Sequence, residues 1–117
     1  IVSRDWSSDV CSSDLHMQQY AYVLKRMKEI KESDGSSMLD NSLVTYGAAL
    51  GDGSTHQYYD LPMIVAGRGQ GQVNQGRFIQ CKSGTLNSNL WLSVAKLMGL
   101  EIESFADSTG LISDMWA

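Results

Sequence analysis

Hydrophobic residues recur every three or four positions in two segments of the chain, and this spacing predicts two amphipathic helices. The first segment covers residues 17–33, and its apolar stripe consists of Met17, Tyr20, Val23, Leu24, Met27 and Ile30. The second covers residues 85–98, where Thr85 or Asn87 can cap the first turn and Gly99 can end the last one.

Two short apolar runs without helical spacing, residues 43–47 and 62–67, predict strands. Runs of this length between turn residues suit strands buried on both faces, as in a parallel sheet covered by helices. Residues 77–80 offer a third short strand. With the two helices, these segments predict an α/β fold: a partial parallel sheet with flanking helices. Two buried strands do not make a stable sheet, so we expect residues 16–117 to be a fragment of one larger α/β domain.

The first fifteen residues differ in character from the rest and are predicted to be a non-native leader. The run DWSSDVCSSDL, from Asp5 to Leu15, reads as the in-frame translation of a sequencing adapter, and residues 1–4 then correspond to adapter stem and barcode. A segment of this origin is set aside before the fold is considered. We expect the natural sequence to begin near His16.

Without this leader, the composition is that of a mildly acidic small domain. Removing Arg4, Asp5, Asp9 and Asp14 changes the net charge from −4 to −2, with 8 basic and 10 acidic residues remaining. Lysines, arginines and glutamates interleave on the polar side of the first helical segment, which indicates a solvated helix face rather than a nucleic-acid patch. No apolar run approaches the ~18 residues of a membrane-spanning helix.

Cys81 is the single cysteine outside the leader. A single thiol forms neither an internal disulfide nor a cysteine-based zinc site, and no histidine stands near it in the sequence to activate a nucleophile. We therefore predict that Cys81 is a small buried hydrophobic residue.

Candidate chemistry is concentrated in the polar loop of residues 48–61. Asp52, His56 and Asp60 recur there at four-residue steps and supply the carboxylate and imidazole ligands that suit a divalent ion, zinc or calcium. The alternative is a solvent-exposed turn, because Gly-Asp-Gly is a common turn sequence and Asp60 can cap the next segment.

Two other loop features have competing interpretations. Tyr58 and Tyr59 either line a ligand-binding cleft or pack over the edge of the sheet. The glycine-rich run of residues 67–71 lacks the Gly-Lys-Ser/Thr of a phosphate-binding loop, and its spacing is broken at Gln72. We therefore predict that residues 67–71 form a flexible connector.

Four short motifs follow one another in a recognisable order: LDNSLVTYG at 39–47, GDGSTH at 51–56, DLPMIVAG at 60–67 and ESFADSTG at 103–110. With these motifs the chain resembles the C-terminal end of the HXXSHH family, a bacterial family of unknown function whose members are typically exported. That family is similar to the alkaline-phosphatase and sulfatase superfamily. The resemblance therefore implies an α/β/α sandwich, metal-dependent hydrolysis of phosphate or sulfate esters, and a secreted or periplasmic location.

The resemblance also implies a role for His56. In related members a late histidine just before a strand ending in Leu-Ala-Gly is a metal ligand, and His56 stands in that position before residues 64–67, which read Ile-Val-Ala-Gly. Members often carry further histidines directly after it, where this chain has Gln57, Tyr58 and Tyr59. This departure indicates that part of the ancestral site has been replaced.

Two hypotheses for the function follow. In the first, the chain is a fragment of an exported metal-dependent hydrolase that acts on a small-molecule or glycan ester; its nucleophile lies upstream, and the fragment alone is inactive. In the second, the chain belongs to a non-catalytic exported binding or surface protein on the same fold, and the loop of residues 48–61 binds a polar ligand such as a glycan through Tyr58, Tyr59 and Asp60. A third hypothesis is that the isolated chain has no function and barely folds.

Overall fold

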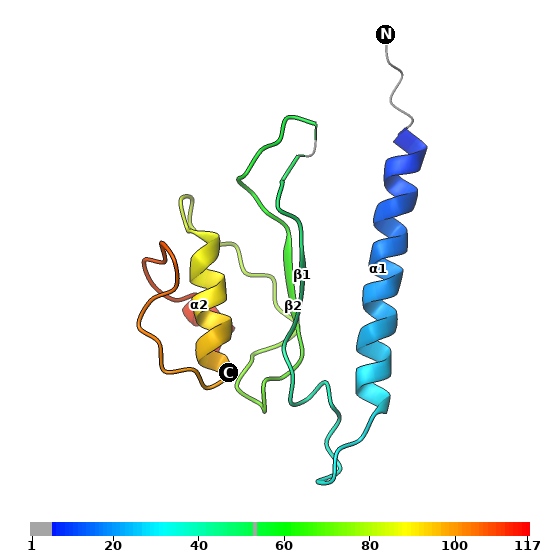
Figure 1. Ribbon diagram of the computed structural model, residues 1–117, viewed down its shortest axis with the longest axis vertical. Coiled ribbons are helices and arrows are strands. Elements are labelled where there is room, and N and C mark those ends of the chain that lie inside the picture. Colours follow the sequence, from blue (N-terminus) through cyan, green and yellow to red (C-terminus); the bar gives the residue numbers. More distant parts are fainter. Residues whose placement is uncertain (1–5, 53) are drawn as a thin grey trace.

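The computed structural model describes residues 6–52 and 54–117, and in this part of the chain two helices lie on either side of one small sheet (Figure 1). The elements in chain order are α1 (Trp6–Glu29), β1 (Val44–Gly47), β2 (Met63–Ala66), α2 (Asn87–Leu97) and a short 3-10 helix, η1 (Ser113–Met115). Among these residues no helix combines the length and the hydrophobicity that crossing a bilayer requires.

The sheet is an antiparallel hairpin, so the predicted parallel sheet is wrong. Strands β1 and β2 pair with Val44 opposite Ala66 and Gly47 opposite Met63. A parallel pair needs a long crossover connection, usually with a helix in it. The described residues between β1 and β2, 48–52 and 54–62, contain no helix, and β2 runs back along β1, which makes the two strands antiparallel.

One face of the hairpin lies against α2 and forms the core. Met63 and Val65, which alternate with outward residues along β2, pack against the buried cluster of Leu90, Leu97 and Met115. Alternation of this kind is what one buried sheet face produces. Both strands are therefore half-buried rather than enclosed on two faces as predicted.

The opposite face of the hairpin lies toward α1 (Figure 1). The Tyr20 ring lies 5.3 Å from the Tyr46 ring, and the Tyr20 hydroxyl donates a 2.9 Å hydrogen bond to the carbonyl oxygen of Val44. Ile64, the strand partner of Tyr46, stays 39% exposed. Helix α1 thus leaves part of this face uncovered.

Helix α1 begins within the predicted leader, of which residues 1–5 lie outside the described residues. It ends at Glu29, earlier than the predicted Ser33, because Lys31 pairs with Ser37 across a tight turn in which Gly35 has a φ of 86°. Of the predicted apolar stripe, three residues are half-buried and three are exposed. The half-buried ones are Tyr20, Leu24 and Met27, and the exposed ones are Met17, Val23 and Ile30.

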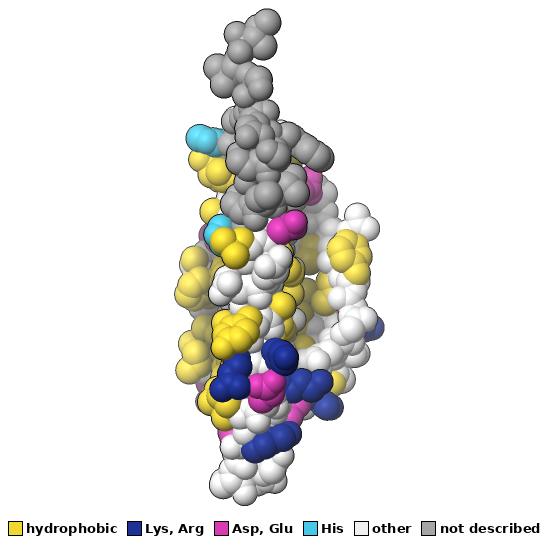
Figure 2. All heavy atoms as spheres, turned by 90° about the vertical axis from the view of Figure 1, so that its right-hand side faces the viewer, with side chains coloured by type: hydrophobic (Ala, Val, Ile, Leu, Met, Phe, Trp, Pro, Cys, Tyr) yellow, Lys and Arg dark blue, Asp and Glu magenta, His cyan; other side chains and the backbone are white. Residues whose placement is uncertain are grey.

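The outward face of α1 is polar and charged toward its C-terminal end. Figure 2 shows basic side chains gathered there around an acidic one. Arg26 and Glu29 form a 2.7 Å ion pair in which both side chains are about half exposed. A pair this exposed contributes little to stability. The arrangement agrees with the predicted solvated helix face.

Helix α2 confirms the second predicted helix, with different capping at its start. Leu86 is the N-cap and makes no side-chain hydrogen bond, so neither Thr85 nor Asn87 caps the helix as predicted. Gly99, at a φ of 85°, follows the last turn as expected of a left-handed stop.

Buried polar side chains of α2 fasten the C-terminal tail to it. Asn89 accepts a 2.8 Å hydrogen bond from the Thr109 amide, and Ser93 accepts one of the same length from the Ile112 amide. Both side chains are buried, at 6% and 0% exposure. These bonds satisfy backbone groups of a segment whose regular structure is limited to the short helix η1.

Residues 77–82 cross the surface as an irregular segment, which corrects two predictions. Residues 77–80 do not form a strand, since no strand of the described chain pairs with them. Ile79 packs on the core, whereas Phe78 is 89% exposed. Cys81 is exposed rather than buried, because the chain has already left the core at this point.

Candidate functional site

The loop of residues 48–61 folds back on itself as an extension of the hairpin (Figure 1). The Gly51 amide donates a 2.8 Å hydrogen bond to the Gln57 carbonyl oxygen, and the Gln57 amide donates one of 3.2 Å to the carbonyl oxygen of Asp52. Gly51 also lies directly against the Tyr59 carbonyl oxygen, where a Cβ atom would collide. The candidate residues therefore stand on a loop that has internal order.

Asp52 serves the turn at the end of this loop. One carboxylate oxygen accepts a 2.7 Å hydrogen bond from the Ser54 amide, and the other accepts a 3.0 Å bond from the Thr55 hydroxyl. This is the turn chemistry proposed as the alternative to a metal site. Among the described residues, no group of three histidine, cysteine or acidic side chains is placed to hold a metal ion. Divalent-ion binding by Asp52 and His56 stays a prediction.

His56 and Asp60 shape the two bends of the loop. Both residues are exposed, and both have left-handed backbone conformations, with φ of 54° and 53°. Such values are uncommon outside glycine, although aspartate and histidine adopt them more readily than most residues do. Their positions are thus set by the turns of the backbone.

The rings of Tyr58 and Tyr59 project from the loop into solvent. They are 76% and 62% exposed, which argues against packing over the edge of the sheet. Two adjacent exposed aromatic side chains give the loop a surface that differs from its otherwise polar sequence.

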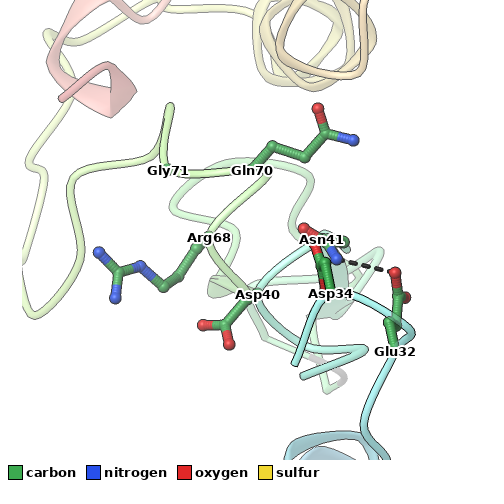
Figure 3. A pocket seen from close by; sticks show the side chains of 7 residues that line it. All are labelled: Glu32, Asp34, Asp40, Asn41, Arg68, Gln70 and Gly71. Atoms are coloured by element: carbon green, nitrogen blue, oxygen red, sulfur yellow. Dashed lines mark hydrogen bonds between the residues drawn. The ribbon is translucent and has the colours of Figure 1, made fainter. Parts of the chain in front are cut away.

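A second place of interest is an open polar cavity of about 620 Å³ (Figure 3), which lies at the opposite end of the hairpin from this loop (Figure 1). Its walls come from the loop after α1 and from the turn after β2. The lining residues are Glu32, Asp34, Asp40, Asn41, Arg68, Gln70 and Gly71. The sequence analysis predicted a flexible connector for residues 67–71 and no binding role for any of the lining residues. Closely spaced Asp, Ser and Asn between two regular elements are the signal that marks such a hydrogen-bonded loop.

Backbone hydrogen bonds join the two walls of this cavity. The Arg68 amide donates a 3.2 Å bond to the Leu39 carbonyl oxygen, and the Gln70 amide donates a 2.8 Å bond to that of Asp40. Gly67 packs so closely on Ser42 that a Cβ atom would collide with the Ser42 carbonyl oxygen. The glycine-rich run predicted as a flexible connector is therefore tied to the neighbouring loop at several points.

The carboxylates of the cavity are hydrogen-bonded within their own loop. Asp34 accepts bonds from the Ser36 hydroxyl and amide, and Asp40 from the Ser37 hydroxyl and amide. These bonds, led by those from the hydroxyl groups, hold the pKa of each carboxyl below its ordinary value. Both groups are thus charged at neutral pH.

Figure 3 shows the Asn41 amide directed toward Glu32, with the two side chains joined by a 2.9 Å hydrogen bond. Arg68 extends from the opposite wall, away from Gln70. The cavity is therefore lined by groups that engage one another or face outward, rather than by groups that converge on one point.

Comparison with known proteins adds no assignment to either place. No protein-family model, curated protein or solved structure matches this chain.

Proposed function

We propose that this chain is part of a non-catalytic binding protein whose loop of residues 48–61 holds a polar ligand such as a glycan. The observation that carries the proposal is the exposure of two adjacent tyrosine rings, Tyr58 and Tyr59, on the loop that extends the hairpin. A tyrosine combines a flat apolar ring with a hydroxyl that donates and accepts hydrogen bonds. These properties complement a sugar, which has apolar C–H faces and polar edges.

The internal order of the loop supports the same role. Hydrogen bonds between Gly51, Asp52 and Gln57 fix the backbone that carries the two rings. A ligand that binds an ordered loop has less chain to immobilise, so more of the contact energy appears as affinity. Tyrosine adds to this because its side chain offers a large contact area at small entropic cost.

The metal-dependent hydrolase hypothesis now has support from the sequence alone. His56 stands where the HXXSHH resemblance expects a metal ligand, but the sandwich implied by the same resemblance is contradicted by the antiparallel hairpin. HXXSHH membership, export of the protein and zinc or calcium binding at Asp52 and His56 are therefore secondary proposals.

The test is a calorimetric titration of the whole chain with two neutral probes, cellohexaose and chitohexaose. We expect one of them to bind, and we expect the double variant Tyr58→Ala/Tyr59→Ala to bind at least about tenfold more weakly, a difference of ~1.4 kcal/mol. Phe78→Ala is the matched control, because Phe78 is an aromatic residue outside the loop that is even more exposed than Tyr58 and Tyr59. Its affinity is expected to equal that of the unchanged chain.

A chelator separates this proposal from the hydrolase hypothesis. Binding that persists in EDTA supports a metal-independent ligand site. Binding that disappears in EDTA and in His56→Ala would favour the metal site instead. An absence of binding to both sugars, or an equal loss in Phe78→Ala, would reject the proposal.

A further inference from the structure

We draw no further inference here: the strongest candidate, the open polar cavity between residues 32–41 and the turn of residues 68–71, is a cluster of acidic groups that already accept hydrogen bonds from Ser36, Ser37 and Asn41, and nothing in the described part of the chain points to a ligand there.

Discussion

Gly67 is the residue at which backbone conformation and packing restrict the sequence most tightly. Its φ of 103° lies in the region that favours glycine, and a Cβ atom would collide with the carbonyl oxygen of Ser42. Gly76 also has a positive φ, of 71°, but its Cβ position meets no atom within 4 Å. Substitution at Gly76 therefore tests backbone strain alone, whereas substitution at Gly67 tests strain together with steric overlap.

We expect Gly67→Ala to lower the free energy of unfolding by about 1–2 kcal/mol through backbone strain, and by a further ~1–3 kcal/mol through overpacking. Gly76→Ala should show only the loss that comes from backbone strain. Urea unfolding followed by tryptophan fluorescence measures both. Equal losses in the two variants would show that the contact with Ser42 has no energetic weight.

Hydrogen bonds from Ser37 lower the pKa of Asp40. The Ser37 hydroxyl donates a 2.7 Å hydrogen bond to the carboxylate and is the largest cause of the lowered pKa of Asp40. A carboxyl whose pKa is lowered by folding stabilises the fold above the ordinary aspartate pKa, and this contribution is lost as the pH falls through the folded pKa.

Ser37→Ala should therefore raise the pKa of Asp40 toward the ordinary value of about 3.9 and reduce the loss of stability in acid. Ser37→Thr keeps the hydroxyl and should keep the lowered pKa. Carboxyl-carbon NMR titration of the three proteins gives the pKa directly. A pKa that does not move in Ser37→Ala would mean that the hydroxyl bond is not its cause.

Helix α1 is attached to the hairpin chiefly through Tyr20. The Tyr20 hydroxyl donates to the Val44 carbonyl oxygen, whereas the hydroxyl of Tyr22 lies on a side chain that is 60% exposed. Burial raises the pKa of the Tyr20 phenol. Because the folded pKa is raised, the protonated Tyr20 phenol contributes its full stabilisation of the fold below the unfolded pKa of about 10. This stabilisation is lost as the pH rises through the folded pKa.

Removing that hydroxyl should loosen α1 without altering the core. We expect Tyr20→Phe to cost about 0.5–1.5 kcal/mol, which corresponds to amide exchange in α1 that is faster by up to about tenfold. Tyr22→Phe should leave the exchange rates unchanged. Hydrogen-exchange mass spectrometry distinguishes the two; identical rates in both variants would show that α1 is held by something else.

The whole molecule has a small core built from the hairpin, α2 and the C-terminal tail. Its buried cluster is Leu90, Leu97 and Met115, and no described residue of α1 belongs to it. Val73 and Trp116 bridge the tail to the segment after β2, which closes the core on that side. Stability of this unit should therefore depend on the tail as much as on the regular elements.

Met115→Ala tests this dependence. Met115 is 4% exposed, so truncation should cost about 2–5 kcal/mol and lower the urea midpoint reported by tryptophan fluorescence. Met98→Ala is the control, because Met98 is 52% exposed at the end of α2. Equal midpoints in the two variants would show that the tail does not contribute to the core.

Local spacing in the sequence determined where the regular elements lie. The three- and four-residue steps predicted α2 and the C-terminal part of α1, although α1 begins at Trp6, well before the predicted start at residue 17. The two apolar runs coincide with β1 and β2 to within one residue at each end. The sequence also predicted the left-handed conformation of Gly99, which follows from its position after the last turn of α2. These features depend on neighbouring residues, so a single sequence is enough to identify them.

The tertiary structure alone decided how these elements associate. Strand direction depends on the path of residues 48–62, and the exposure of Cys81, Tyr58 and Tyr59 depends on what lies next to them in space. Likewise, the sequence was compatible with Asp52 as a metal ligand and as a turn residue. Only the three-dimensional arrangement shows its carboxylate hydrogen-bonded to Ser54 and Thr55. Burial and pairing are properties of contacts between residues distant in the chain, which local periodicity does not encode.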